Sequence, residues 1–496
     1  MNRFTTFGNM TEFFWFGVLI AAATILTAFG EISARKGWIS LFNARKGVHV
    51  TVALCCALSI ELIPINKWFI GAVGAIVILL LYSVSKKWFS IDNPHNRTSW
   101  GIFYFGLSYF LLLIFWGEKS PVTVVLAMAV MGLADAMAAL VGRSFPVPAL
   151  KLGNEEKSWA GSSTFFVISS VLLFGALYLL NWLNYPCAML VLFGFVLWLT
   201  LIENSSANGS DNLSVPLLFG VLFPFLFGPL SRIEVASRFL EVLPFVTLFG
   251  LLSFRSKSLS SSGTITAISL GVLLYSLGGW IFVVPILAFF ISGSVLSRLL
   301  QTNEQVLEKT GARDPLQVIA NGGAPLLALL LGVFSSNMDW AIMGFLGSVA
   351  SATSDTWSTE WGMRFGGTPR HILNLSPIEK GLSGGVTLPG FMGALGGSVF
   401  IASMGLFFMA FGNWFWAIIV IGVFGSVTDS LLGLLQAKYQ LPESDDQLPN
   451  LTEKKVWNGI TLKKVKGLKW IGNDVVNFCS SLLALFASFL FAAITL

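Results

Sequence analysis

Acidic residues recur beside glycine, serine and asparagine where long apolar segments end. In the first half of the chain, Asp135 lies within GLADAMAALVGR, and Asp211 and Asn212 lie within IENSSANGSDNLSVPLL, which also contains Glu203. Carboxylate and amide oxygens bind Mg²⁺, whereas lysine ammonium groups and exposed backbone N–H groups bind phosphate. An aspartate inside an apolar helix is costly in a membrane and indicates a functional site by default. Together these residue types favour a site for a magnesium–nucleotide complex.

Basic residues and glycines accompany these acids. Lys46 and His49 lie near the start of a predicted helix in ARKGVHV, and Lys157, Ser158 and Gly161 precede another apolar segment in EEKSWAGSSTFF. Each feature also has a purely structural explanation. A lysine at the end of a span can anchor it at the interface, small residues can pack helices closely, and Asn–Gly sequences often form only a turn. Both interpretations stay open for the single residues.

The second half contains more such segments. SATSDTWSTEWG, with Asp355 and Glu360, follows an apolar run that we interpret as the end of a membrane-spanning helix, and GSVTDSLLG places Asp429 in an apolar helix. GLSGGVTLPG is rich in glycine immediately before a span, where it can present successive N–H groups to phosphate. Arg313 and Asn321 flank the start of another span. A second phosphate-binding site is therefore predicted in this half.

The elements that position these residues follow from composition. The chain has 496 residues, of which 55% are hydrophobic and 11% are charged, whereas soluble domains carry about 25% charged residues. Continuous apolar runs near the length of a bilayer span predict helices, because helices satisfy their backbone hydrogen bonds in lipid. The expected fold is an all-α polytopic integral membrane protein with roughly sixteen transmembrane helices. We expect two tandem helical bundles, residues 1–240 and 241–496.

The distribution of charge predicts the orientation. Loops that contain basic residues, such as Arg35, Arg143, Arg255 and Arg364, alternate with short loops that contain few, and basic loops stay in the cytoplasm. Every loop rich in Asp, Glu, Asn, Ser and Gly also falls on the predicted cytoplasmic side, so one water-facing surface carries the predicted chemistry. We expect a bacterial inner-membrane protein whose active sites face the cytoplasm. The net charge of +5 suits an anionic lipid surface, and the chain has no basic, aromatic-rich patch for a nucleic acid.

The first half resembles the polyprenol kinase family, which includes dolichol kinase, phytol kinase and CTP-dependent diacylglycerol kinase. RKGVH, DAMAALVGR, KSWAGS and DNLSVPL carry the resemblance, over residues 33–230. It implies transfer of the γ-phosphate of CTP, or of ATP, onto a lipid alcohol with Mg²⁺ as cofactor. Asp135 and Asp211 are then candidate catalytic residues and metal ligands. The candidate nucleotide- and phosphate-binding residues are Lys46, His49, Gly142, Arg143, Lys157, Ser158, Gly161 and Asn212.

The second half resembles an integral membrane family that includes phytyl-phosphate kinase of plant tocopherol synthesis. SDTWSTEWG, SGGVT, GSVTDSLLG and NGGAPLLAL carry this resemblance, which spans essentially the whole half. It implies nucleotide-dependent phosphorylation of an isoprenyl monophosphate to the diphosphate. Asp355, Glu360 and Asp429 are candidate catalytic residues, with Asp355 and Asp429 as metal ligands. The candidate phosphate-binding residues are Arg313, Asn321, Thr356, Arg370, Lys380, Gly384, Gly385, Asn473 and Asn477.

The combined prediction is a bifunctional isoprenoid alcohol kinase. A lipid alcohol such as phytol or geranylgeraniol would be converted to its monophosphate by the first half and to its diphosphate by the second. The expected partners are the isoprenoid, its monophosphate, a nucleoside triphosphate and membrane lipid, with no nucleic acid. Two alternatives stay open. One is a CDP-lipid cytidylyltransferase, which releases pyrophosphate; the other is a membrane transporter, since intramembrane acids and glycine breaks also occur in transporters.

Overall fold

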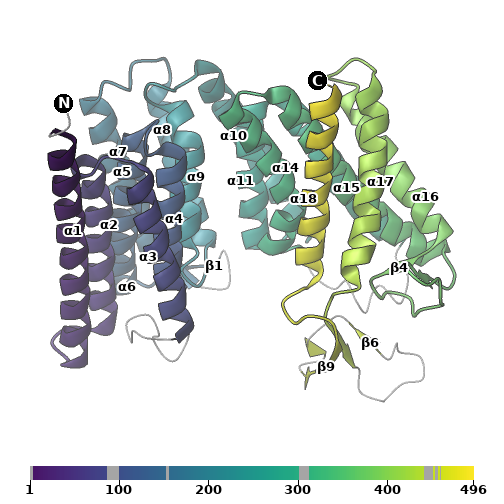
Figure 1. Ribbon diagram of the computed structural model, residues 1–496, viewed down its shortest axis with the longest axis horizontal. Helices are drawn as coiled ribbons and strands as arrows, with labels where there is room; N and C mark the ends of the chain where they lie inside the picture. Colours follow the sequence, from purple (N-terminus) through teal and green to yellow (C-terminus); the bar gives the residue numbers. More distant parts are fainter. Residues whose placement is uncertain are drawn as a thin grey trace. The chain divides into compact units, whose positions relative to one another are not determined.

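The computed structural model describes residues 4–86, 100–151, 156–300, 312–440, 451–452, 456–457 and 460–495. The chain divides into two compact units, unit 1 from Met1 to Leu243 and unit 2 from Pro244 to Leu496. The division falls inside one helix, α10 (Ile233–Arg255), at its internal Pro244. Figure 1 labels helices and strands of both units. That the two units carry separate activities stays a prediction.

Unit 1 consists of helices and one short hairpin. Ser40 caps α2 by accepting a hydrogen bond from the backbone N–H of Asn43, and β1 and β2 form an antiparallel hairpin before α7. A π-helical segment, η2, joins α5 to α6, so that these three form one continuous helix. The elements are α1 (Phe4–Arg35), α2 (Leu41–Leu62), α3 (Lys67–Lys86), α4 (Gly101–Trp116), α5 (Pro121–Ala129), η2 (Val130–Ala134), α6 (Asp135–Ser144), β1 (Ala149–Lys151), β2 (Glu156–Ser158), α7 (Trp159–Leu179), α8 (Ala188–Ser205) and α9 (Asp211–Leu226).

Unit 2 adds several short strands to its helices. The strands form a three-stranded sheet in the order β6–β5–β9 and two hairpins, β3–β4 and β7–β8, and the sheet lies beyond the ends of α17 and α18 (Figure 1). The elements are α11 (Ser261–Gly278), η3 (Trp280–Phe282), α12 (Val284–Leu299), α14 (Pro315–Ser335), α15 (Met338–Phe365), β3 (Arg370–His371), β4 (Gly385–Val386), α16 (Leu388–Gly405), α17 (Asn413–Gly433), β5 (Lys438–Gln440), β6 (Leu451–Thr452), β7 (Val456–Trp457), β8 (Ile460–Thr461), β9 (Lys463–Lys466) and α18 (Asn473–Thr495).

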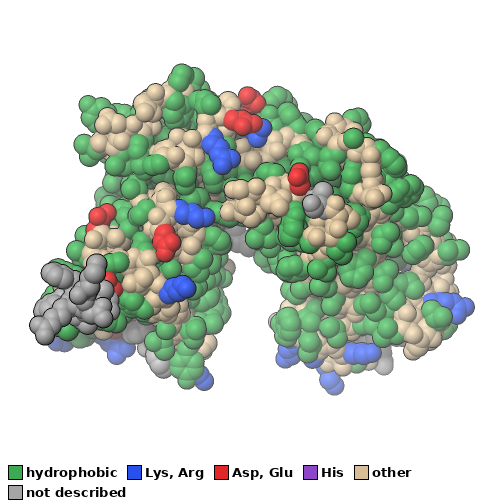
Figure 2. All heavy atoms as spheres, turned by 45° about the horizontal axis from the view of Figure 1, so that its top comes forward, with side chains coloured by type: hydrophobic (Ala, Val, Ile, Leu, Met, Phe, Trp, Pro, Cys, Tyr) green, Lys and Arg blue, Asp and Glu red, His purple; other side chains and the backbone are tan. Residues whose placement is uncertain are grey.

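The helices have the length and composition of membrane spans. Within the described residues, twelve helices are long and apolar enough to cross a membrane, and α4 and α9 are shorter apolar helices. Together with α2 and α15, which are long but more polar, these make sixteen helices in the described part of the chain. Figure 2 shows hydrophobic side chains over most of the visible surface, as expected for helices that face lipid. The predicted all-α polytopic membrane fold is confirmed.

One prediction about local structure was wrong. We interpreted the residues before Ser351 as the end of a span, but α15 runs without interruption from Met338 to Phe365. The helix tolerates polar residues because α12, α14, α16, α17 and α18 pack against it. Its hydroxyls also bond to its own backbone: Ser348 Oγ donates to Gly344 O and Thr353 Oγ1 donates to Val349 O, both at 2.8 Å. The polar residues Ser351–Ser354 therefore lie in the interior of a helix bundle and not in a loop.

Candidate functional site

Three carboxylates from separate helices meet in unit 1. Asp135 begins α6, Glu203 lies in the last turn of α8, and Asp211 begins α9. One oxygen of each lies within 4.8 Å of one oxygen of the other two, which is close enough for all three to hold one metal ion. Asp135 and Glu203 are only 6% and 5% exposed. Among the described residues, no other group of three or more acidic, histidine or cysteine side chains lies this close together.

Two lysines face these three carboxylates. Lys46 Nζ, on α2, donates to Asp135 Oδ2 at 2.6 Å. Lys157 Nζ, just before α7, donates to the Glu203 carboxylate and to Glu203 O at 2.7 Å, and it lies 3.9 Å from Asp211 Oδ2. Isolated buried charges are costly, whereas paired and hydrogen-bonded ones are tolerated. The sequence therefore builds a mixed-charge cluster from four helices and the strand before α7.

Neighbouring carboxylates keep the side chain of Lys157 protonated. Lys157 lies in β2, outside the membrane-spanning helices. Burial favours the neutral amine and lowers the pKa of Lys157, but the carboxylates of Glu203 and Asp211 outweigh burial, so the net pKa is raised. The ammonium group is therefore present at neutral pH and can face either a carboxylate or a phosphate.

Helix α2 packs along the continuous helix α5–η2–α6 through one stripe of residues. His49, one turn beyond Lys46, donates from Nε2 to Met131 O at 3.1 Å and lies 3.7 Å from Asp135 Oδ2. Met131 belongs to η2, where π-helical geometry interrupts the regular hydrogen-bond ladder and presents a carbonyl to another partner. A Cβ on Gly132 would lie 2.3 Å from the Cβ of Ala53. The two helices thus approach closely beside Asp135, which fixes Lys46 and His49 against it.

The predicted glycine and serine of the KSWAGS segment hold α7 against α6. Ser158 Oγ accepts a hydrogen bond from Gly161 N at 3.1 Å, which caps α7, and it donates to Gly142 O at 3.2 Å. A Cβ on Gly142 would lie 3.3 Å from Gly161 Cα. Gly142, Ser158 and Gly161 therefore position Lys157 by allowing the two helices to meet. None of these contacts excludes a phosphate at the same helix end.

Asn212 is the predicted residue with an unsatisfied polar atom. It lies in the first turn of α9 beside Asp211, and its Oδ1 is buried without a hydrogen-bond partner among the described residues. A buried amide oxygen without a partner is unusual and is a suitable ligand for a cation or an acceptor for a substrate N–H or O–H. The start of α9 also carries the positive end of its helix dipole. Both features make this helix end a polar wall of the cluster.

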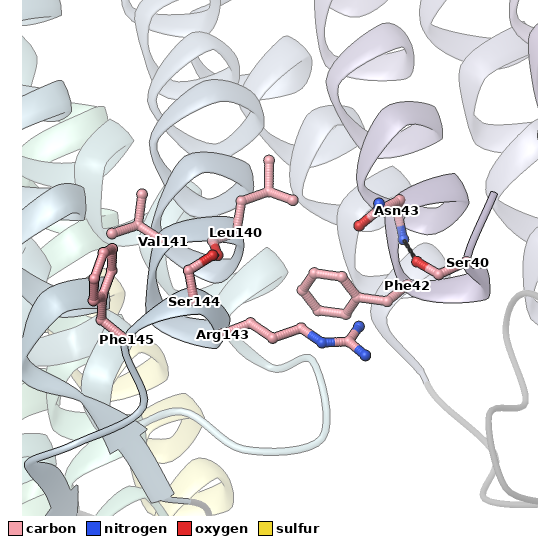
Figure 3. A pocket seen from close by; sticks show the side chains of 8 residues that line it. All are labelled: Ser40, Phe42, Asn43, Leu140, Val141, Arg143, Ser144 and Phe145. Carbon is pink, nitrogen blue, oxygen red and sulfur yellow. Dashed lines mark hydrogen bonds between the residues drawn. The ribbon is translucent and has the colours of Figure 1, made fainter.

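A pocket of about 530 Å³ adjoins the α2–α6 contact. Figure 3 shows Arg143 extending beneath the ring of Phe42, with Asn43 and Ser40 on the α2 side and Ser144 on the α6 side. The guanidinium carbon of Arg143 lies 4.7 Å from the ring centroid of Phe42, which is a cation–π distance. The remaining lining residues are Leu140, Val141 and Phe145. Arg143, a predicted phosphate-binding residue, thus lies in this pocket.

The acids of unit 2 lie at one level of two parallel helices. Three glycines show which residues of α15 and α17 are neighbours. A Cβ at Gly347 would contact Ile421, one at Gly422 would contact Ala350, and one at Gly425 would contact Ser351. Because residue numbers rise together along both helices, α15 and α17 run parallel. Asp355 is one turn beyond Ser351 and Asp429 is one turn beyond Gly425. The two predicted metal ligands therefore lie at the same height along the helix bundle.

The start of α18 joins this level. Ser480 Oγ lies 3.1 Å from Asp429 Oδ2 and 3.1 Å from Asn477 O. Asn473 begins the same helix one turn earlier. Asp429 therefore lies beside α18, the helix that begins with Asn473 and also carries Asn477. The roles of Asp355 and Asp429 as metal ligands stay a prediction.

Glu360 lies on a different face of α15. It is 1% exposed, and Ser297 Oγ of α12 donates to its Oε1 at 2.6 Å. Five residues separate Glu360 from Asp355, which is about 140° around a helix of 3.6 residues per turn. Thr356, one turn before Glu360, packs against Gly293 of α12. Glu360 and Thr356 therefore face α12, and Asp355 does not share their face.

Arg313 provides a positive charge near Glu360. Its guanidinium carbon lies 5.1 Å from the ring centroid of Phe290 on α12. Burial lowers the pKa of Arg313, and the Glu360 carboxylate opposes that effect. Because an arginine keeps its proton at any physiological pH, this group remains a cation at the α12–α15 contact.

The remaining predicted residues lie in local structures. Gly384 has φ +91, and a Cβ there would lie 2.2 Å from Leu434 Cδ2, so only glycine fits. Gly385 pairs with His371 in the β3–β4 hairpin, which also contains Arg370. Arg370 Nη1 donates to Leu375 O at 3.1 Å and Asn321 Nδ2 donates to Gln317 O at 3.0 Å. Lys380 is half-buried in the loop between β3 and β4.

Glu203 is the residue that our candidate list lacked. It was visible in IENSSANGSDNLSVPLL, but the motif DNLSVPL directed the assignment to Asp211 and Asn212. Glu203 lies at the end of an apolar helix, where an acid is as costly as Asp135 is in its own helix. Applying the same criterion to both acids would have added it. Its neighbour Asn204 is also buried and accepts a hydrogen bond from Ser162 Oγ at 2.7 Å.

Comparison with known proteins identifies the relatives of the chain. The model of the integral membrane protein family DUF92 matches residues 244–485. An uncharacterized membrane protein of Methanocaldococcus jannaschii is 31% identical over 212 residues, which cover 41% of this chain and 86% of that protein. Protein PGR of Arabidopsis thaliana is 28% identical, with 49% of this chain and 92% of PGR covered. The chloroplastic protein VTE6 of the same plant is 27% identical, with 44% of this chain and 61% of VTE6 covered.

No solved structure gives a significant match. The family match includes all of the predicted acids of unit 2, Asp355, Glu360 and Asp429, and ends within α18. The chain is therefore an integral membrane protein that belongs, through residues 244–485, to the DUF92 family.

Proposed function

We propose that the protein is a membrane phosphotransferase that acts on an isoprenoid lipid, with unit 1 phosphorylating the alcohol and unit 2 phosphorylating the resulting monophosphate. The donor is a nucleoside triphosphate, CTP or ATP, bound with Mg²⁺. The observation that carries the proposal is the cluster of Asp135, Glu203 and Asp211 with Lys46 and Lys157. For unit 2, the support is the resemblance to phytyl-phosphate kinases together with the DUF92 match.

The residues of the cluster fit a magnesium ion. Mg²⁺ binds oxygens at about 2.1 Å, so ligands on opposite sides are about 4.2 Å apart, and the three carboxylate oxygens already lie within 4.8 Å of one another. The buried, unpartnered Oδ1 of Asn212 is a further oxygen in the residue next to Asp211. A bound Mg²⁺ supplies neutralisation of the phosphate charge at such a site.

The lysines and helix ends of unit 1 suit a triphosphate. Phosphoryl transfer depends mainly on positioning and on stabilising negative charge. Lys46 and Lys157 each carry an ammonium group that a phosphate oxygen can share with a carboxylate. The N-terminal ends of α7 and α9 lie beside Lys157 and Asp211, and helix N-termini favour anions. The donor phosphates would therefore lie between these helix ends and α2.

The reaction at unit 1 transfers one phosphoryl group. The lipid hydroxyl oxygen bonds to the γ-phosphorus, the bond from that phosphorus to the bridging oxygen breaks, and the nucleoside diphosphate leaves. The hydroxyl proton passes to a carboxylate, and Asp135 and Asp211 are the candidates because each faces a lysine. The apolar tail of the substrate would remain between the membrane-spanning helices.

Unit 2 requires a different balance of charge. A monophosphate is already an anion, so its site needs less base and more positive charge than the alcohol site. Arg313, held between Phe290 and Glu360, meets this requirement, and Arg370 and Lys380 are the other candidates. Asp355 and Asp429, level with each other on α15 and α17, would hold the metal–nucleotide complex. We further propose that the sites of both units face the cytoplasm.

The test uses purified protein in liposomes. It is supplied with γ-labelled CTP or ATP, MgCl₂, and phytol or geranylgeraniol, and the lipid products are separated. Label first in the monophosphate and then in the diphosphate supports the proposal. Release of pyrophosphate with a CDP-lipid product indicates a cytidylyltransferase instead. If neither nucleotide labels any lipid, the proposed function is wrong.

A further inference from the structure

The pocket between α2 and α6 is open to solvent and lined by residues of mixed chemistry. It has a volume of about 530 Å³. One side is the first turn of α2, with Phe42 and Asn43, and the other is the last turn of α6, with Arg143 and Ser144 (Figure 3). An aromatic ring, a guanidinium group, an amide and hydroxyls form its walls. These are the groups that stack on planar rings and bond to their polar edges.

The pocket and the Lys46–Asp135 pair lie along the same pair of helices, α2 and α6. On α2, Phe42, Lys46 and His49 are four and three residues apart and therefore share one helical face. Phe42 meets Arg143, Lys46 meets Asp135, and His49 meets η2, so this face runs along α6 from the pocket to the cluster. The pocket and the Lys46–Asp135 pair of the cluster thus belong to one contact between α2 and α6.

The distance between the pocket and the Lys46–Asp135 pair suits the distance between the base and the phosphates of a nucleotide. Asn43 precedes Lys46 by three residues, which is about 4.5 Å along α2, and Arg143 follows Asp135 by eight residues, which is about 12 Å along α6. A triphosphate held by Lys46 and the carboxylates would therefore place its nucleoside at the pocket. We propose that this pocket binds the base and ribose of the donor nucleotide, with Phe42 stacking on the base and Asn43 bonding to its edge. This proposal rests on the proposed function of unit 1.

The isoprenoid is a poorer occupant of this pocket. Six of its eight lining residues, Ser40, Asn43, Leu140, Arg143, Ser144 and Phe145, are exposed, and four of these six are polar or charged. Basic residues gather at the same helix ends, including Arg35 at the end of α1, Lys36 after it and Arg45 in α2. These charges favour contact with water and phosphate over lipid tails. A long apolar tail needs a lining without such groups. The observations therefore favour a ligand that arrives from water.

The test separates the base from the phosphates. Equilibrium dialysis measures labelled CTP and ATP on the full-length protein in nanodiscs with MgCl₂, and tripolyphosphate is used as a competitor that has phosphates but no base. Phe42→Ala should weaken nucleotide binding about tenfold, because a stacking contact is lost, while competition by tripolyphosphate changes less than twofold. Asn43→Ala, at an exposed position, should change the ratio of CTP to ATP affinity. Phe29→Ala, exposed on α1 away from the pocket, is the matched control.

Different failures have different meanings. If Phe42→Ala weakens the binding of tripolyphosphate as much as the binding of nucleotide, or changes the binding of neither, the pocket does not bind the base. Weaker binding of geranylgeraniol with unchanged nucleotide binding would assign the pocket to the lipid and overturn the proposal. If the unmodified protein binds tripolyphosphate as tightly as nucleotide, the base makes no contact and only this inference fails. Binding of neither ligand would contradict the proposed function itself.

Discussion

Lys46 and Asp135 are 89 residues apart in the sequence, and Lys46 Nζ donates to Asp135 Oδ2 at 2.6 Å. The pair joins α2 to α6, and both side chains are nearly buried, at 13% and 8% exposure. Since both charges have little access to water, each depends on the other or on a ligand of opposite charge. The pair is thus both a structural contact and a means of presenting a cation and a carboxylate to the same substrate.

Replacing Asp135 should separate the two proposed reactions. Asp135→Asn keeps the shape of the side chain but removes the carboxylate, so phosphorylation of the alcohol should stop while added monophosphate is still converted to diphosphate. Both products are measured by thin-layer chromatography with γ-labelled nucleotide. Loss of both reactions in folded protein would indicate a single shared site and contradict the division of labour.

The complementary change is in unit 2. Asp355→Asn should leave the alcohol reaction intact and cause the monophosphate to accumulate, because Asp355 lies level with Asp429 at the proposed second site. The same time course of labelled products measures this effect. Asp339→Asn, at the opposite end of α15, is the matched control. Normal diphosphate formation by the Asp355 variant would remove this residue from the proposed mechanism.

Glu203 should matter as much as the acids chosen from the sequence. Glu203→Gln removes one of three clustered carboxylates, and the alcohol reaction should fall about 100-fold or more, the upper range for residues that support a metal site. Raising MgCl₂ should recover part of the lost rate. As a control, Glu234→Gln changes an exposed acid that pairs with Arg238 on its own helix, and it should leave the rate unchanged. Equal rates for the two variants would exclude Glu203 from the site.

Replacing Lys157 should make the thermal stability of the protein depend on divalent ions. Lys157→Met leaves the buried carboxylate of Glu203 and the half-buried carboxylate of Asp211 without their cation, and breaking a buried pair such as Lys157–Glu203 costs about 3–5 kcal/mol. Thermal unfolding in detergent should therefore occur at a lower temperature in EDTA, and MgCl₂ should raise it again more than in the unmodified protein. Lys67→Met, exposed at the start of α3, should respond to neither. A variant with unchanged unfolding in EDTA would contradict the importance of this pair.

The close approach at Gly132 should also be required. A valine there would collide with Ala53, because even a Cβ would lie 2.3 Å from the Cβ of that alanine. Overpacking of this kind costs about 1–3 kcal/mol, and it would move Lys46 away from Asp135. The expected results are a lower unfolding temperature and weaker nucleotide binding. Gly175→Val is the control, since nothing lies within 4 Å of a Cβ at Gly175.

The fold could be predicted from the sequence, whereas the assembly of the site could not. Apolar length alone identifies most spans, because lipid leaves a chain few ways to satisfy its backbone. Helices α2 and α15 were harder to predict as spans, since Lys46 and Asp355 interrupt their apolar character. Such residues are tolerated in lipid because neighbouring helices pack against them. The residues before Ser351 were therefore interpreted as the end of a membrane-spanning helix, whereas α15 continues to Phe365.

The partners of each charge depend on tertiary packing. Nothing in the local sequence indicates that Lys157 pairs with Glu203 or that His49 reaches a carbonyl in a π-helical turn. Asp355 and Glu360 are close in sequence, yet a helix directs them to different neighbours. Spacing along the chain could thus indicate which residue types are present, but only the crossing of α2 with α6, and of α8 with α9, determines which ones meet.

The polar character of α15 has a consequence for how the protein enters the membrane. Serine, threonine and acidic residues make this helix a poor candidate for independent insertion, because each polar group costs free energy in lipid unless a neighbour shields it. Three of the helices that pack against it, α16, α17 and α18, are synthesised after it. α15 must therefore wait at the translocation machinery, or at the bilayer surface, until later parts of the chain arrive. A polypeptide that stops between α15 and α16 would lack the partners that keep this helix in the bilayer.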